Sequence, residues 1–345
     1  RHTRCSRDWS SDVCSSDLRR GMRMGSKRLG NLLGKSRLAN EEITQTHKNL
    51  ASSAQKHLER AFLLNARILQ SRHGTQNLCL AGGVALNCLA NGRLKKESGF
   101  KNVFVPPGCG DSGGALGAAL YLGSILDQTA DMKIHHSYWG PSFTDREVER
   151  EARSSGFVWK KTESQKELLL AASSSLTESK VLGWFQGAME FGPRALGNRS
   201  ILALPRDSSM QDRVNRIKRR EKFRPFAPMV PQDRAPEFFE LDGCSPYMLF
   251  AVNVRENARA MLRAVTHVDG TARVQTVNQQ SNPILHELLT VIGELTGVPV
   301  LLNTSFNLED EPIVCRPADA FRTFARSELD ELFIGRYIVS RKKNL

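Results

Sequence analysis

The residues best suited to chemistry in this sequence are cations held in segments rich in glycine and proline. The segment Gly187–Ser200, GAMEFGPRALGNRS, carries Arg194 and Arg199 five residues apart. Planar guanidinium groups held in a rigid loop match the oxygens of phosphates and carboxylates bidentately. A salt-bridged surface loop is the alternative, but the flanking segments are too apolar to favour it. We therefore predict that this loop binds an oxyanion.

A second basic segment, Asn215–Pro228, reads NRIKRREKFRPFAP and contains Lys218 and Arg224. Six of its residues are basic, and Phe223 and Phe226 are interleaved with them. Cations with aromatics are also typical of RNA-binding surfaces. No consensus of a single-strand-binding module accompanies them, so we favour a pocket for a small polyanion.

Two glycine-rich turns follow apolar strand-like runs. The first contains Gly82, Gly83 and Asn87, and the second contains Gly110 and Asp111. Glycine at a strand–helix turn lets backbone N–H groups approach a phosphate closely, and a loop carboxylate can reach a metal or a nucleotide-bound cation. Taken singly, such turns are more often structural and such aspartates more often helix caps. Together on consecutive strands, they favour nucleotide binding.

A set of polar residues in two further segments completes the candidate site residues. His267, Asp269 and Arg273 share the run THVDGTARVQTV, and Asn303 and Ser305 follow a buried strand where they can orient a carbonyl or phosphate. Capping is the alternative for this cluster. The sequence has no GxSxG elbow, HExxH motif or P-loop lysine, which disfavours triad hydrolases, zincins and P-loop enzymes.

The composition indicates a globular protein rather than a membrane or disulfide-bonded one. The 345 residues suffice for two domains, and no run of eighteen apolar residues occurs. Seven cysteines without a CxxC pair argue against a disulfide framework or zinc knuckle, so a reducing cytoplasm is expected. The net charge is +13, of which residues 1–40 supply +7 from ten Lys or Arg against three Asp.

Hydrophobic periodicity predicts a mixed α/β chain. We expect a leader over 1–39 that is disordered or a cloning or assembly scar, a first domain over 40–130, a linker over 131–143 and a second domain over 144–345. The expected helices cover 43–68, 84–94, 113–126, 144–155, 164–178, 208–218, 282–296 and 317–326. The expected strands cover 77–81, 102–105, 181–185, 248–254, 272–277, 298–303 and 331–334.

Six motifs in order resemble the O-carbamoyltransferases of the NodU/CmcH type, from nodulation-factor and antibiotic biosynthesis. They are LAGGVALNCLANGRL, PPGCGDSGGALGAAL, FQGAMEFGPRALGNRSILALPRD, NRIKRREKFRPFAPMV, HVDGTARVQTV and LLNTSFN with EPIV. The resemblance covers the chain from about residue 40 to its end. It implies the C-terminal part of a truncated actin-like ATPase (ASKHA) domain, followed by a YrdC-like domain.

The resemblance also implies an activity. The YrdC-like domain is expected to join carbamoyl phosphate and ATP, with Mg²⁺, into a carbamoyl-adenylate, and the first domain to pass the carbamoyl group to a hydroxyl of a sugar- or antibiotic-type acceptor. A divalent metal, usually Fe²⁺, is implied with Asp111 as a ligand. Gly82, Gly83, Asn87 and Gly110 are implied to hold the nucleotide. The implied catalytic residues are Lys218, Arg224 and Arg273, and the implied substrate-binding residues are Arg194, Arg199, Asn303 and Ser305.

Departures from the family pattern limit these expectations. Histidine metal ligands from the family's N-terminal half have no counterpart here, so we expect adenylation but not the complete transfer from this chain. Ala188 stands where many relatives have Arg, and Asp310 where Gly is expected. The alternatives are a nucleic-acid-binding protein that uses 213–224 and a tRNA threonylcarbamoyl-modifying protein. The family also implies a homodimer. No membrane partner is expected, because the sequence has no long apolar run, and nucleic acid is disfavoured as a partner.

Overall fold

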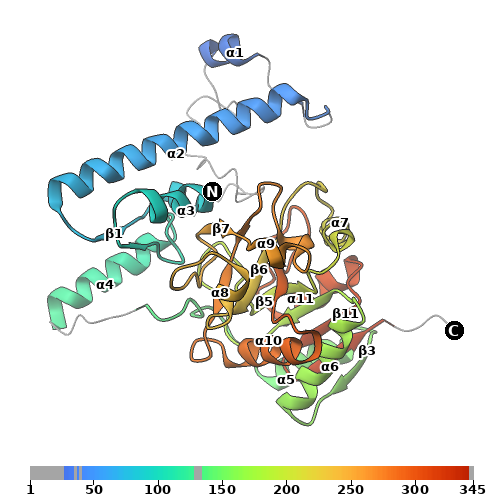
Figure 1. The fold of residues 1–345 in the computed structure, drawn as a ribbon. Coiled ribbons are helices and arrows are strands. Elements are labelled where there is room, and N and C mark those ends of the chain that lie inside the picture. Colours follow the sequence, from blue (N-terminus) through green and yellow to red (C-terminus); the bar gives the residue numbers. More distant parts are fainter. Residues whose placement is uncertain (1–26, 35–36, 39–40, 128–133, 342–345) are drawn as a thin grey trace. The chain divides into compact units, whose positions relative to one another are not determined.

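The computed structural model describes residues 27–34, 37–38, 41–127 and 134–341, and Figure 1 traces its elements. The chain divides into two compact units, residues 1–77 with 93–102, and residues 78–92 with 103–345. Residues 134–143 of the expected linker fall inside the larger unit. Its residues 131–133 and most of the expected leader lie outside the described residues. No helix in the described ranges is long and apolar enough to cross a bilayer.

The smaller unit is built on one long helix. After the short α1 (Lys27–Leu33), α2 runs from Gln45 to His73, close to the helix expected over 43–68. It begins at Thr44, whose backbone N–H donates to His47 Nδ1 at 3.1 Å, and ends at Gly74 with φ +62°. Arg93, within α3 (Cys88–Glu97), donates to Glu59 of α2 at 3.0 Å. This ion pair helps to fix α3 against α2.

The helix expected over 84–94 is interrupted at Asn87. A 3-10 turn, η1 (Gly83–Leu86), precedes α3 (Cys88–Glu97), and Asn87 between them has ψ 92°. Its Oδ1 accepts from the N–H of Ala90 at 3.0 Å, which is the bond of a helix N-cap. The prediction of one continuous helix was therefore wrong, because the asparagine caps a new one. Around this turn lie β1 (Asn77–Cys79) and β2 (Asn102–Phe104), which pair with each other, and α4 (Gly113–Asp127).

A mixed eight-stranded sheet organises the larger unit, in the order β3-β12-β11-β4-β5-β10-β6-β9. Its strands are β3 (Val158–Lys161), β4 (Leu182–Phe185), β5 (Arg199–Ala203), β6 (Ala227–Pro231), β9 (Gln275–Val277), β10 (Leu301–Ser305), β11 (Glu331–Ile334) and β12 (Tyr337–Ser340). The pairs β11–β4 and β6–β9 are parallel, and the other neighbours are antiparallel.

Helices cover both faces of this sheet (Figure 1). On one face lie α6 (Gln165–Thr177) and α10 (Pro283–Thr296), and on the other lie α5 (Asp145–Ser154), α7 (Ser208–Ile217) and α11 (Pro317–Arg326). Successive strand residues point to opposite faces, so Leu301 packs with α6 and α10 while Leu302 packs with the other three helices. The mixed α/β class expected from the sequence is confirmed.

Short elements bring the predicted loops onto one side of the larger unit. β7 (Ala251–Asn253) pairs with β8 (Thr271–Arg273), near α8 (Ala235–Phe238), α9 (Glu256–Arg259) and η2 (Arg263–Val265). A small core joins Ala85 and Cys109 of the glycine turns to Leu196 of the arginine loop and to residues 247–250. This core gathers segments more than a hundred residues apart.

Candidate functional site: an unpaired arginine pair

The two predicted glycine turns lie against each other. The N–H of Gly82 donates to the carbonyl of Cys109 at 2.6 Å, and a Cβ on Gly110 would lie 3.9 Å from the Cα of Gly83. Gly82 has φ +100°, a backbone conformation that favours glycine. The structure therefore brings together Gly82, Gly83 and Gly110, which the sequence predicted as one nucleotide-binding group.

The loop between β4 and β5 packs directly on the second turn. A Cβ on Gly192, which has φ +114°, would lie 2.5 Å from the carbonyl oxygen of Pro107. A Cβ on Gly108 would lie 2.7 Å from the ring of Phe191. These approaches leave no room for side chains. Glycine is thus required at both positions for the loop that carries Arg194 to lie on the turn.

Arg194 and Arg273 form a pair of like charges. Arg273 is the largest influence on Arg194, followed by burial, and together they lower the pKa of Arg194 to about 9. Leu196, two residues beyond Arg194, packs in one core with Ala85 and Cys109 of the glycine turns. In the described part of the chain neither arginine has a hydrogen-bond or ion-pair partner, and the Nε of each is buried. Two adjacent unpaired guanidinium groups are suited to an oxyanion.

Two amides hold the segments that carry the arginines. Asn303 Nδ2 donates to the carbonyl of Ala195 at 3.0 Å and to Gln275 Oε1 at 2.7 Å. Gln275 Nε2 in turn donates to the carbonyl of Leu196 at 2.7 Å. Ala195 follows Arg194 directly, and Gln275 lies two residues beyond Arg273. The Nδ2 of Asn303, which was predicted to bind substrate, thus donates to protein atoms, while its buried Oδ1 has no partner among the described residues.

Lys218 lies in a second cluster at the end of β10. Its Nζ donates to the Ser305 carbonyl at 2.6 Å and to Asn307 Oδ1 at 2.8 Å, with the Asn307 carbonyl at 2.9 Å and Ser305 Oγ at 3.3 Å. Burial first, and Arg220 second, lower the pKa of Lys218, while Glu311 opposes them. The four oxygens favour the ammonium form. The structure therefore joins Lys218 to Ser305, two residues to which the resemblance assigns substrate contacts, and adds Asn307.

Two other predicted arginines are engaged within the protein. Arg224 Nε pairs with Glu221 Oε2 at 2.7 Å on the loop that follows α7. Arg199 is fully buried, stacks 3.6 Å above the ring of Phe185, and donates to the carbonyls of residues 141, 186, 187 and 198. Its contacts in the described structure are architectural, and its substrate-binding role stays a prediction.

The described residues do not form a metal centre. No group of three or more His, Cys, Asp or Glu side chains is close enough to hold an ion in the described ranges. Asp111 is exposed at the start of α4, and its carbonyl accepts from the N–H of Gly114 at 3.1 Å. One carboxylate does not provide the several ligands that a divalent ion requires. The implied Fe²⁺ therefore does not fit these residues by themselves.

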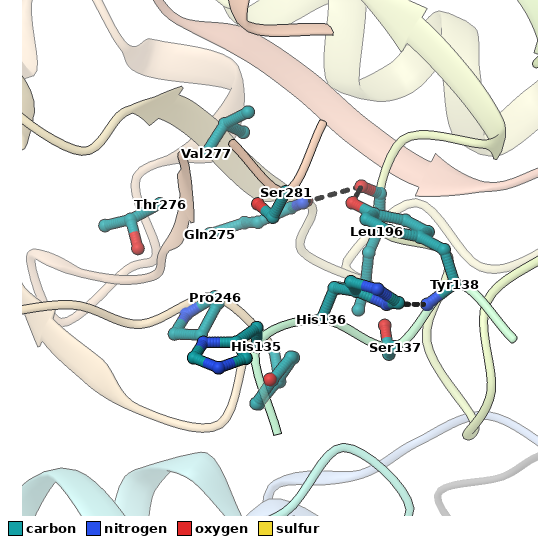
Figure 2. Close-up of a pocket in the computed structure, with 11 residues that line it drawn as sticks. His135, His136, Ser137, Tyr138, Leu196, Pro246, Gln275, Thr276, Val277 and Ser281 are labelled. Atoms are coloured by element: carbon teal, nitrogen blue, oxygen red, sulfur yellow. Dashed lines mark hydrogen bonds between the residues drawn. The ribbon is translucent and has the colours of Figure 1, made fainter. Parts of the chain in front are cut away.

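A small pocket lies beside the arginine loop (Figure 2). The carbonyl of Leu196 accepts from both Tyr138 Oη, at 3.0 Å, and Gln275 Nε2, and burial raises the pKa of Tyr138. The remaining lining residues are His135, His136, Ser137, Pro246, Tyr247, Thr276, Val277 and Ser281. Tyr138 therefore helps to fix the arginine loop at Leu196.

Sequence reasoning missed three residues that organise the site. Glu190 accepts from the backbone of the loop that carries Arg194. Gln275, two residues beyond Arg273, donates to the same loop at Leu196. Asn307 accepts from Lys218. Each stands inside a motif that the sequence had already singled out. The available signal was therefore their position in those motifs, since an amide or carboxyl alone does not indicate its partner.

Comparisons with known proteins agree with this assembly. The model of the carbamoyltransferase C-terminus matches residues 173–341, and that of the carbamoyltransferase N-terminus matches residues 15–120. The two models together match more than half of the chain, so the chain belongs to the carbamoyltransferase family. The N-terminal match begins within the expected leader.

Three curated relatives illustrate the similarity. Nodulation protein NolNO of Sinorhizobium fredii is 46% identical over 307 residues, which are 87% of this chain and 45% of that protein. Nodulation protein NolO of Bradyrhizobium diazoefficiens is 42% identical over 87% of this chain and 56% of its own length. The 3'-hydroxymethylcephem-O-carbamoyltransferase of Streptomyces clavuligerus is 38% identical over 75% of this chain and 47% of its own length. The chain spans about half the length of these relatives.

Two solved structures resemble the chain weakly. A phosphate- and nucleotide-bound full-length HypF superposes with a TM-score of 0.37 at 16% identity, over 50% of this chain and 26% of its own. A Sua5 variant from P. abyssi superposes with a TM-score of 0.35 at 12% identity, over 50% of this chain and 49% of its own.

Proposed function

We propose that this chain binds carbamoyl phosphate at Arg194 and Arg273 and activates it with ATP as a carbamoyl-adenylate, for transfer to a hydroxyl of a small-molecule acceptor. The observation that carries the proposal is the arginine pair, which lacks any partner in the described structure. Membership of the carbamoyltransferase family supports the carbamoyl substrate. The cephem O-carbamoyltransferase among its relatives supports a hydroxyl acceptor.

The arginine pair suits a phosphorylated substrate on electrostatic grounds. Two cations enclosed together repel each other, and a dianion placed between them replaces that repulsion with two attractions. Each guanidinium can donate two parallel hydrogen bonds to phosphoryl oxygens. Donors fixed before the substrate arrives need no reorganisation during the reaction. The amides of Asn303 and Gln275 supply this fixation by holding the backbone next to both arginines.

The proposed reaction has three steps, which are hydrolysis of carbamoyl phosphate, adenylation of carbamate and transfer to the acceptor. Water first hydrolyses carbamoyl phosphate to carbamate and inorganic phosphate. A carbamate oxygen then attacks the α-phosphorus of ATP, the bond from the α-phosphorus to the bridging oxygen breaks, and pyrophosphate departs. The acceptor oxygen then attacks the carbamoyl carbon, and AMP leaves. In this proposal Lys218 and Arg224 offset charge on the phosphates, Ser305 orients the carbamoyl end, and the glycine turns approach the nucleotide.

Metal ions have a limited place in this proposal. ATP would arrive with Mg²⁺, which neutralises triphosphate charge. Because Asp111 has no companion ligands in the described part of the chain, we assign no step to Fe²⁺. The domain assignment, with an actin-like part over 40–130 and a YrdC-like part over 144–345, belongs to the same proposal.

The test is carbamoyl-phosphate-dependent ATP–pyrophosphate exchange by the purified chain. We expect exchange in the wild type and a loss of about a hundredfold or more in Arg194→Ala and in Arg273→Ala, because each removes a preorganised donor. Arg150→Ala is the matched control, since its exposed side chain pairs only with Glu151 on the surface of α5.

The outcomes separate the parts of the proposal. Exchange that needs carbamoyl phosphate and persists in both arginine variants would show that the pair is not its binding site. A folded wild type without exchange would contradict adenylation by this chain. Calorimetry with carbamoyl phosphate then determines whether the anion still binds.

A further inference from the structure

Glu190 closes a ring of backbone around Arg194. Its Oε1 accepts from the backbone N–H groups of Leu196 and Asn198, both at 2.7 Å, and of Arg199 at 3.2 Å. Its side chain starts four residues before Arg194, and the first of these bonds returns to the chain two residues after it. A single carboxylate oxygen thus fixes the backbone on both sides of the arginine.

The carboxylate of Glu190 is committed to the backbone rather than to an ion pair. The Nη groups of the nearest cation, Arg199, donate to main-chain carbonyls instead. Only 6% of Glu190 is exposed, and its Oε2 has no partner among the described residues. Burial raises the pKa of Glu190, and the backbone donors oppose that shift. An acid enclosed at this cost has a role that an apolar residue does not fill.

Three other positions of this loop are also held. The ring of Phe191 lies against Gly108, Gly192 lies against Pro107, and the carbonyl of Ala195 accepts from Asn303. The guanidinium of Arg194, in contrast, makes no bond in the described structure. The backbone on both sides of Arg194 is therefore fixed, although the guanidinium itself forms no hydrogen bond within the described ranges that would orient it.

We propose that Glu190 is a positioning residue that holds Arg194 opposite Arg273 and thereby sets the oxyanion affinity of the pair. This inference rests on the proposed function, in which the oxyanion is carbamoyl phosphate, but it concerns any phosphate-like anion at the pair. Glu190 itself lies beneath the loop and does not touch the ligand.

The experiment compares Glu190→Gln and Glu190→Ala with the wild type. Hydrogen exchange of the amides at 196, 198 and 199 reports loop closure, and calorimetry with inorganic phosphate and with carbamoyl phosphate reports anion affinity. Glutamine keeps one acceptor oxygen, so Glu190→Gln should retain protection and remain within about threefold in affinity. Glu190→Ala should lose protection at these amides and bind both anions about tenfold or more weakly, with the ATP affinity unchanged.

A matched control separates positioning from general destabilisation. Glu147→Ala removes another carboxylate that binds backbone N–H, at the cap of α5, and should lower stability without changing anion affinity. Normal phosphate affinity in Glu190→Ala, or an equal loss of ATP affinity, would overturn the inference. Phosphate binding that depends on Glu190 and Arg194 in a chain without ATP–pyrophosphate exchange would overturn the proposed adenylation and leave the inference standing.

Discussion

Arg194 is held at a cost to folding, and the proposed binding of an anion would account for that cost. The pKa of Arg194 is lowered to about 9, first by Arg273 and then by burial. A cation whose pKa is lower in the folded than in the unfolded chain binds its proton less tightly when folded. The free energy of unfolding therefore rises with pH as the pH passes about 9, and the full penalty applies at neutral pH. An anion at the pair removes this penalty.

We predict that Arg194→Gln stabilises the anion-free chain. Removing one of two enclosed like charges should raise the free energy of unfolding by about 1–3 kcal/mol near neutral pH. The gain should shrink as the pH approaches about 10. Thermal unfolding in an anion-poor buffer measures this, with Arg150→Gln as the control. Carbamoyl phosphate should stabilise the wild type and not the variant, and a variant less stable than the wild type would contradict the repulsion.

The chemistry of the site was easier to predict from the sequence than its internal contacts. Arg194 was singled out because guanidinium groups suit oxyanions. Arg273 was singled out in the run THVDGTARVQTV and through the family resemblance. Asn303 was expected to face substrate, whereas its Nδ2 holds Ala195 and Gln275. Glu190 was missed, since a carboxyl binding three backbone N–H groups has no pattern in the sequence. Residue type indicates chemistry, while the partner depends on the tertiary structure.

At the scale of elements, glycine placement decides whether the arginine loop fits its neighbour. Gly192 combines φ +114° with a position where a Cβ would lie 2.5 Å from the carbonyl oxygen of Pro107. Gly156 has a similar positive φ of +74° but open space around it. Backbone strain should lower the free energy of unfolding by about 1 kcal/mol in both Gly192→Ala and Gly156→Ala.

We predict that only Gly192→Ala also weakens phosphate binding, by about tenfold or more, because the displaced loop carries Arg194. Thermal unfolding and calorimetry with inorganic phosphate on both variants check this. Equal anion affinity in the two variants would show that the loop tolerates the shift.

Most long elements followed from periodicity, whereas the sheet did not. The helices expected over 113–126, 144–155, 164–178, 208–218, 282–296 and 317–326 are confirmed within a residue or two. β3, β5, β6 and β12 were missed, although the equally short β4 and β11 were predicted. Charged or proline residues interrupt the apolar runs of β3, β5 and β6, which weakens their strand pattern. Asp310, where glycine was expected, has φ +60°, which an aspartate tolerates.

The basic stretch 213–224 is largely committed within the protein. Arg213 pairs with Asp330 at 2.7 Å, and Arg219 Nη2 donates to the carbonyl of Arg326 at 2.8 Å. Arg220 donates to Asn215 Oδ1 at 2.7 Å and stacks 4.5 Å from the ring of Phe226. Cations held in this way offer few free charges to a polynucleotide, so these contacts do not favour the RNA-binding alternative.

At the scale of the whole molecule, α4 is unusual. No residue from Gly113 to Leu126 of this apolar helix is buried, and Tyr121 and Leu126 are 70% and 74% exposed. A helix that is apolar on all sides is normally enclosed. The relatives are about twice as long as the region they share with this chain. The exposure of α4 is therefore a reason to test the adenylation step separately from the complete transfer.

The net charge of +13 makes weak polynucleotide binding the natural rival to a specific anion site. Because residues 1–40 supply +7 of it, we predict that removing residues 1–39 abolishes most binding to single-stranded RNA and leaves phosphate affinity unchanged. RNA binding by the full chain should fall steeply with salt, and Arg194→Ala should not alter it. Fluorescence anisotropy with a labelled oligonucleotide across a salt series, alongside calorimetry with phosphate, measures both. RNA binding that survives the deletion and competes with phosphate would instead place nucleic acid at the arginine pair.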